Sequence, residues 1–111
     1  MELIERVRID WKNTAKNLKL LRLTNTNLRR YVCFALNREK EFDGCGGKDC
    51  MTCKYEMDSS ISQSELAQVF GVKESQIANW ETGKSHPMLE YLIFYCRLCQ
   101  IELNELIVFV R

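Results

Sequence analysis

The sequence predicts an all-α fold in which a helical N-terminal extension precedes a domain of five helices. Glycine is scarce and proline occurs once in 111 residues, so few positions would interrupt a helix. Apolar residues recur at the spacing of a helix with one buried face along most of the chain. A chain of this length suffices for one domain with a modest hydrophobic core.

The first two helices are expected near residues 11–23 and 27–42. Residues 1–9 fit either a helix or a strand, and we favour an extended start. One face of each helix is apolar and should be buried: Ala15, Leu18 and Leu21 in the first helix, and Leu28, Tyr31, Val32, Ala35 and Leu36 in the second. We interpret residues 1–24 as a basic N-terminal extension and residues 25–111 as the domain.

The clearest motif begins at a capping box formed by Ser62 and Glu65, after which apolar residues at helical spacing lead to Gly71. The pattern then restarts and ends again at Gly83. Both helices are too short to be stable alone, so the pattern predicts a helix-turn-helix with a shared core. The core residues are expected to be Leu66, Ala67, Phe70, Val72, Ile77 and Trp80.

Two further helices are expected, at residues 88–100 and 103–107. The core face of the longer one should contain Leu89, Leu92, Ile93, Cys96 and Cys99, with the two cysteines acting as small apolar residues. Its other face should pack under the N-terminal helix or form a dimer interface, through Tyr91, Phe94, Tyr95 and Leu98. Residues 107–111 have high β-propensity and are suited to pair with an N-terminal strand, in this chain or a partner.

Three of the six cysteines lie in residues 43–60, a Cys-rich loop inserted ahead of the helix-turn-helix. Cys45, Cys50 and Cys53 follow the pattern C-x4-C-x2-C. Three thiols this close in sequence can converge on one metal ion, with Cys33 as the natural fourth ligand and Asp43, Asp49 or His86 as weaker candidates. Zinc is the leading metal, while an iron-sulfur cluster, a redox-active disulfide and an unliganded loop stay open as alternatives.

Charge is distributed unevenly along the chain. Residues 1–40 carry ten basic and four acidic side chains, a net charge of +6, whereas residues 41–111 carry a net charge of −5. A DNA-binding protein needs a positive surface because neutralisation of phosphates supplies most of its non-specific affinity. We therefore expect the N-terminal residues to help hold a duplex.

The sequence also indicates a cellular compartment. No apolar run approaches the roughly 20 residues that a membrane helix needs, and the charged N-terminus is not that of a signal peptide. We expect a cytoplasmic protein without a membrane partner. Cytoplasmic thiols stay reduced, which favours metal binding or core packing over disulfides.

The helix-turn-helix region resembles the Xre/Cro family of phage-repressor-like regulators. The resemblance is carried by residues at the fixed offsets of the family: Gln63, Leu66, Ala67, Gly71, Val72, Ile77, Trp80, Glu81, Gly83 and Pro87. It covers residues 27–107, and the insertion at 43–60 departs from the family pattern because the first two helices of the family are normally close in sequence. It implies the five-helix repressor-like fold, with the helix at 27–42 as the first helix.

The resemblance implies that the helix at about residues 73–81 reads the major groove of double-stranded DNA. The side chains expected to meet base edges are Lys73, Glu74, Ser75, Gln76 and Asn79. Those expected to contact phosphates are Gln63, Thr82, Lys84 and Ser85. Glu81 is interpreted as an ion-pair or hydrogen-bond residue, and His86 as a surface loop residue. Members of the family commonly dimerise on two-fold symmetric sites, so a homodimer is expected.

These observations favour a sequence-specific DNA-binding transcriptional regulator, modulated by a metal or by redox state at the cysteines. The alternative is a protein-interaction module with the same fold, antitoxin-like or a phage adaptor, which the acidic charge of residues 41–111 motivates. An enzyme is disfavoured because the sequence contains no nucleophile–base pair, no phosphate-binding loop and a single histidine.

Overall fold

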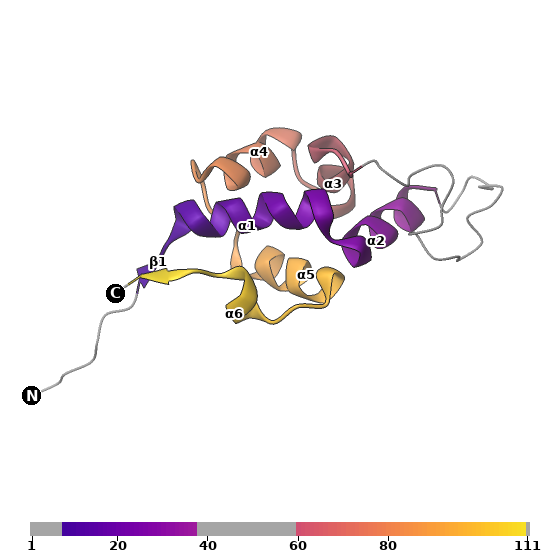
Figure 1. The fold of residues 1–111 in the computed structure, drawn as a ribbon. Helices are drawn as coiled ribbons and strands as arrows, with labels where there is room; N and C mark the ends of the chain where they lie inside the picture. Colours follow the sequence, from indigo (N-terminus) through magenta and orange to yellow (C-terminus); the bar gives the residue numbers. More distant parts are fainter. Residues whose placement is uncertain (1–7, 38–59, 111) are drawn as a thin grey trace, which may run out of the picture.

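The computed structural model describes residues 8–37 and 60–110. These residues form six helices and one two-stranded sheet (Figure 1). In chain order the elements are β1 Arg8–Ile9, α1 Trp11–Thr24, α2 Thr26–Asn37, α3 Gln63–Phe70, α4 Glu74–Thr82, α5 Leu89–Cys99, α6 Leu103–Leu106 and β2 Phe109–Val110. The all-α prediction is confirmed. The end predicted for the second helix and most of the Cys-rich loop, residues 38–59, lie outside the described residues.

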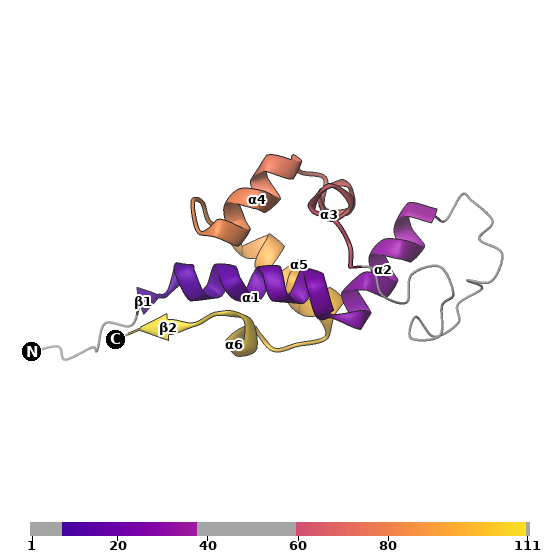
Figure 2. The same ribbon diagram turned by 45° about the horizontal axis from the view of Figure 1, so that its top comes forward.

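Helix α1 runs through the middle of the molecule, with α3 and α4 on one side and α5 and α6 on the other (Figures 1 and 2). It packs against α4, α2 and α6, while α2 packs against α5 and α3. Ala15 and Leu18 of α1 are both buried. The helix that the sequence analysis placed in an N-terminal extension therefore shares a hydrophobic core with the helix-turn-helix.

The helix ends follow from their capping residues. Ser62 Oγ accepts from the Glu65 N–H at 3.0 Å, and the Glu65 carboxylate accepts from the Ser62 N–H at 2.9 Å, which confirms the predicted capping box. Helices α3 and α4 end at Gly71 and Gly83, whose φ values of 72° and 82° lie in the left-handed region that glycine tolerates best. At the start of α1, Asp10 accepts from the Asn13 N–H, and this hydrogen bond lowers the pKa of the Asp10 carboxyl.

The core confirms most of the predicted apolar faces and corrects two of them. Its residues without any exposed surface include Leu18, Leu28, Val32, Leu66, Ile77, Tyr95 and Leu106. The prediction for α5 was wrong at three positions, because Tyr95 is fully buried whereas Leu89 and Ile93 are 62% and 43% exposed. The face of α5 that meets the core consists of Leu92, Tyr95 and Cys99. This face is rotated about the helix axis relative to the predicted one. Tyr31 of α2, predicted to be buried, is 46% exposed.

The chain ends of the described region lie together. Strands β1 and β2 pair antiparallel, with Arg8 opposite Val110 and Ile9 opposite Phe109. The Asp10 N–H donates to the Val108 carbonyl at 2.7 Å, and the Val108 N–H donates to Thr14 Oγ1 at 2.9 Å. The extended start and its pairing with the C-terminal strand of the same chain are thus confirmed for the described residues. This pairing fastens the C-terminal segment along α1.

Candidate nucleic-acid interface

Helices α3 and α4 are joined by a tight turn at residues 71–73. The Val72 N–H donates to the Ala67 carbonyl at 3.0 Å, which closes the end of α3. Lys73 is the N-cap of α4, and its N–H donates to Gln76 Oε1 at 3.1 Å. Lysine has no side-chain acceptor for the first N–H groups of the helix, so of the two hydrogen bonds of a capping box only the one accepted by Gln76 is made here.

Helix α4 has one buried face and one exposed face. Ile77 and Trp80 are buried against α3 and α5, with 0% and 4% exposure. Trp80 also contacts the ring of Tyr91, at a centroid distance of 5.2 Å. The exposed face contains the predicted base-reading residues Lys73, Glu74, Ser75 and Gln76, and Asn79 beside them is half-buried. The predicted base-reading residues therefore lie together on a helix whose opposite face is packed into the core.

The segment after α4 folds back over the last turn of the helix. The Asn79 carbonyl accepts from the N–H groups of Lys84 at 2.9 Å and Ser85 at 3.3 Å. The Thr82 hydroxyl donates to the Ala78 carbonyl at 3.0 Å. The side chains of Thr82, Lys84 and Ser85, predicted to contact phosphate, are all exposed.

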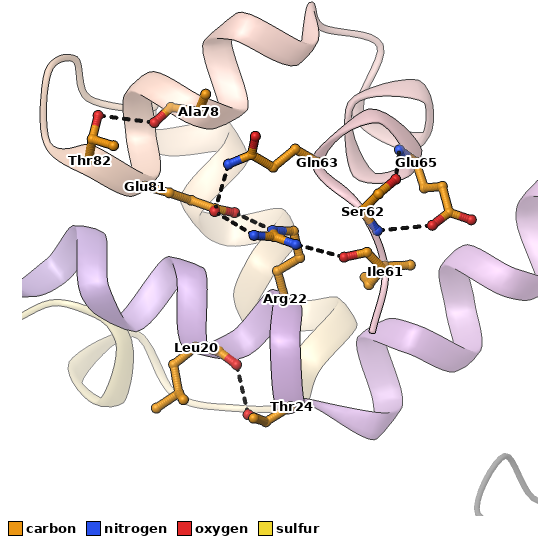
Figure 3. A network of polar contacts seen from close by, with 10 residues as sticks. All are labelled: Leu20, Arg22, Thr24, Ile61, Ser62, Gln63, Glu65, Ala78, Glu81 and Thr82. Carbon is orange, nitrogen blue, oxygen red and sulfur yellow. Dashed lines mark hydrogen bonds and ion pairs between the residues drawn. The ribbon is translucent and has the colours of Figure 1, made fainter. Parts of the chain in front are cut away.

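A buried ion pair holds α4 onto α1 (Figure 3). Arg22 Nε and Nη2 donate to the two Glu81 carboxylate oxygens at 2.7 and 3.0 Å, and Arg22 Nη1 donates to the Ile61 carbonyl at 2.7 Å. The Glu81 side chain is 1% exposed and the Arg22 side chain 10% exposed. The interpretation of Glu81 as an ion-pair residue is confirmed.

Glu81 also holds Gln63, the residue predicted to contact phosphate. Gln63 Nε2 donates to Glu81 Oε1 at 3.1 Å, so one carboxylate joins α1, α3 and α4. Gln63 is half-buried, and its amide nitrogen is directed inward (Figure 3). Its backbone N–H lies in the first turn of α3, where the positive end of the helix dipole favours an anion.

The loop after α4 is also fastened to the start of α1. The rings of Trp11 and His86 are stacked, with centroids 4.1 Å apart and planes 8° from parallel. A Cβ on Gly83 would lie 3.8 Å from the Cα of Lys12 and 3.9 Å from the Cβ of Ala15. His86 was interpreted as a surface loop residue. It is exposed, and its ring also covers Trp11.

Two contacts of this site were not predicted from the sequence: the ion pair of Arg22 and the stacking of Trp11 on His86. Arg22 occupies a helical position in line with Ala15 and Leu18 on the buried face of α1. A charged residue inside an apolar stripe signals a buried partner, because an unpaired charge is too costly to bury. The sequence contains no comparable signal for the stack of Trp11 and His86.

The cysteines divide into those inside and those outside the described region. Cys33 lies on α2 and is half-buried, whereas Cys45, Cys50 and Cys53 lie outside the described residues. Over residues 8–37 and 60–110, no three potential metal ligands lie close enough to share an ion.

Cys96 and Cys99 were interpreted as packing residues of α5. Cys99 is 1% exposed and Cys96 is half-buried. Burial raises the pKa of the Cys99 thiol to about 12, and burial followed by the charges of Glu102 and Glu105 raises the pKa of Cys96. A raised pKa disfavours the thiolate, the form of cysteine that acts as a nucleophile or a metal ligand.

Comparison with known proteins identifies the part of the chain that contains this surface. A family model described as helix-turn-helix matches residues 58–106, which contain α3, α4, α5 and α6. Searches of curated proteins and of solved structures returned no match. Separately, none of the helices in the described part of the chain is long and apolar enough to cross a membrane.

Proposed function

We propose that the chain is a sequence-specific DNA-binding regulator of transcription of the Xre/Cro type; the support is the match of a helix-turn-helix family model to residues 58–106, together with the sequence resemblance described above. Helix α4 enters the major groove of double-stranded DNA and reads base edges. The family acts by binding rather than by catalysis, and we propose no enzymatic activity.

One observation carries the proposal: the exposed polar side chains of α4 stand on a helix whose other face is buried. The amides of Gln76 and Asn79 match the donor–acceptor pattern of adenine, and the Lys73 ammonium matches the acceptors of guanine. To read adenine, Gln76 has to share its Oε1 with the Lys73 N–H or release that hydrogen bond. The Glu74 carboxylate can accept from the amino group of cytosine. A helix fixed by its core residues and by Glu81 presents these groups with little freedom to reorient.

The proposed phosphate contacts lie beside the C-terminal end of this helix, since Gln63 is hydrogen-bonded to Glu81 in its last turn. Lys84 and Ser85 follow α4 and are exposed, and the first turn of α3 offers backbone N–H groups beside Gln63. Thr82 is also exposed, although its hydroxyl donates to the Ala78 carbonyl. We propose that Gln63 contacts phosphate through its backbone N–H, since its side-chain amide nitrogen donates to Glu81.

The test is a selection of the full chain against a random library of DNA duplexes, followed by binding titrations at several salt concentrations. We expect one enriched sequence, bound more tightly than random duplex, with log affinity falling linearly with log salt. Binding without an enriched sequence would contradict sequence-specific reading. No binding at low salt would contradict the whole proposal and favour the alternative, an antitoxin-like or phage-adaptor protein-interaction module.

We also propose that the protein binds as a homodimer. A two-fold symmetric pair would place two copies of α4 in successive major grooves, about 34 Å apart. Light scattering coupled to gel filtration, on the protein alone and on its complex with the selected duplex, measures the stoichiometry. One protein per duplex would contradict this proposal.

For the cysteines, we propose that Cys45, Cys50, Cys53 and Cys33 bind zinc and that metal or redox state there tunes DNA binding. The support is the spacing of three thiols in one short segment. Elemental analysis and a visible spectrum of protein purified with and without oxygen test it. One zinc per chain is expected; iron with sulfide, or no metal, would contradict the assignment.

A further inference from the structure

Three lysines form one exposed stripe on α1. Lys12, Lys16 and Lys19 are spaced by four and three residues, so they lie on the same side of the helix. All three side chains are exposed. Within the described parts of the chain, no carboxylate lies at ion-pair distance from them, since the ion pair found there joins Arg22 and Glu81. We call these residues the lysine stripe.

The position of the stripe on α1 can be read from the contacts of its neighbours. Arg22 meets Glu81 of α4, and Ala15 lies beside Gly83, so these two residues mark the side of α1 that faces α4. At 3.6 residues per turn, Lys12 and Lys19 lie about 60° round the helix from Ala15 and Arg22. The buried residues Thr14 and Leu18 lie round the helix in the opposite direction.

The same construction applies to α4. Glu81 marks its side toward α1. At 3.6 residues per turn, Ile77 and Trp80 lie about 40° and 100° round the helix from Glu81 in one direction, toward the core. Ser75 and Asn79 lie about 120° and 160° round in the other direction, so Asn79 faces almost directly away from α1. The core therefore occupies one side of the plane through α1 and α4. The lysine stripe and Ser75 of α4 occupy the other side, while Gln76 and Asn79 face away from α1, one on each side of that plane.

The start of the stripe also lies next to a proposed phosphate contact. Lys12 is adjacent to Gly83, whose Cβ position is 3.8 Å from the Cα of Lys12, and Lys84 and Ser85 follow directly. The stack of Trp11 on His86 fixes this end of α1 to the same loop. From Lys12 to Lys19 the stripe extends about 10 Å along the helix.

We propose that the lysine stripe is a second backbone-binding surface for DNA, which continues the phosphate contacts of the loop after α4 along α1. This inference rests on the proposed function. It names the lysines as a source of the positive charge that DNA binding needs and that residues 41–111, with a net charge of −5, do not supply. A phosphate strand bound by Lys84 and Ser85 would pass next to Lys12, at the start of the stripe. The contacts are sequence-independent, because ammonium groups bind phosphates as point charges.

Point substitutions test this better than a truncation, because α1 also contributes Leu18 and Arg22 to the core. The test variant is Lys12→Gln with Lys16→Gln in the full chain. The control is Arg30→Gln with Arg97→Gln, which removes the same charge from exposed positions on α2 and α5. Thermal melts should show that both variants fold like the wild type, since all four side chains are exposed.

Binding to the selected duplex and to a random duplex is measured across salt concentrations. For the lysine variant we expect the slope of log affinity against log salt to become shallower by about 2, at about 0.9 per phosphate contact. The ratio of specific to random affinity should stay unchanged. The control variant should keep the wild-type slope.

Equal slopes for the lysine variant and the control, with normal binding by the wild type, would overturn this inference and leave the proposed function intact. A lowered specificity ratio would also overturn it, because the lysines would then take part in base reading. A wild-type protein that binds no duplex would overturn both proposals.

Discussion

At the residue scale, Glu81 is the carboxylate on which the interface depends. It accepts hydrogen bonds from Arg22 and from Gln63, and its side chain is 1% exposed. Removing one member of such a pair leaves a buried charge without its partner, which costs far more than the net contribution of the intact pair. The contributions of Arg22 and Glu81 to the free energy of unfolding are therefore expected to be strongly non-additive.

The substitution Arg22→Leu should lower the free energy of unfolding by about 3 to 5 kcal/mol, because the Glu81 carboxylate then stays buried and unpaired. The double variant Arg22→Leu with Glu81→Leu should recover much of this loss. Urea denaturation of the two single variants and the double variant measures the coupling energy. Additive losses would show that the pair does not interact in solution.

Tyr95 presents the opposite case, a buried polar group whose hydroxyl has no hydrogen-bond partner among the described residues. Burial raises the pKa of this hydroxyl, with the charge of Glu81 as the next contribution. Such a group costs about 1 to 3 kcal/mol when it is left unsatisfied. The ring contributes by packing edge-on against Phe70, at a centroid distance of 5.0 Å.

Tyr95→Phe should therefore leave the free energy of unfolding unchanged or raise it by about 1 kcal/mol, since the ring contact is kept and the unpaired hydroxyl is removed. Tyr91→Phe, at a half-buried position on the same helix, is the control and should change stability little. Urea denaturation gives both values. A loss of more than about 1 kcal/mol for Tyr95→Phe would mean that a buried water satisfies the hydroxyl in solution.

At the element scale, the two glycines that end α3 and α4 fix the geometry of the interface. Gly71 and Gly83 have φ values of 72° and 82°, and neither has an atom closer than 3.8 Å to its Cβ position. Space is therefore not the constraint at either position. The left-handed backbone is the constraint, because a Cβ is disfavoured there by about 1 to 2 kcal/mol.

Gly71→Ala and Gly83→Ala should each lower the free energy of unfolding by about 1 to 2 kcal/mol. The two losses should be similar, although Gly83 lies against α1 and Gly71 is open to solvent. Chemical denaturation measures both. A much larger loss at Gly83 would instead indicate that the close approach of α1 leaves no room for a methyl group.

The elements differ in how far their sequence predicts them. The capping box at Ser62 and the end of each helix at a glycine are local, so the sequence alone was sufficient for α3 and α4. The core face of α5 was predicted only in part. Aromatic and aliphatic side chains occur all round this helix, so its sequence does not distinguish the buried face from the others. The pairing of Arg22 with Glu81 joins residues 59 positions apart, and no local pattern identifies such a partner.

At the scale of the whole molecule, the basic charge and the helix-turn-helix are contributed by segments that are distant in sequence. Residues 8–37 carry seven basic side chains and one acidic one, whereas residues 60–110 carry three basic and six acidic. The packing of α1 against α4 brings the basic segment to the helix-turn-helix. The uneven distribution of charge along the chain thus places a basic helix beside the helix-turn-helix. The sequence predicted that the N-terminal residues supply positive charge, but not that α1 packs against α4.

This arrangement predicts that α1 cannot be removed without loss of the fold. A fragment of residues 25–111 lacks the fully buried Leu18 and leaves Glu81 without its arginine. We expect circular dichroism and thermal melts of the fragment to show no cooperative unfolding transition. A fragment that melts cooperatively would contradict this expectation and support the division of the chain at residue 24.

The central claim, that α4 reads base edges, is tested most directly by the affinity of Asn79→Ala for the selected duplex and for random duplex. Asn104→Ala, an exposed asparagine on α6, serves as the matched control. We predict that Asn79→Ala loses about 5- to 150-fold in affinity for the selected duplex, the equivalent of one bidentate base contact, and almost nothing for random duplex. Equal losses on both duplexes, or no loss on either, would contradict base reading by this helix.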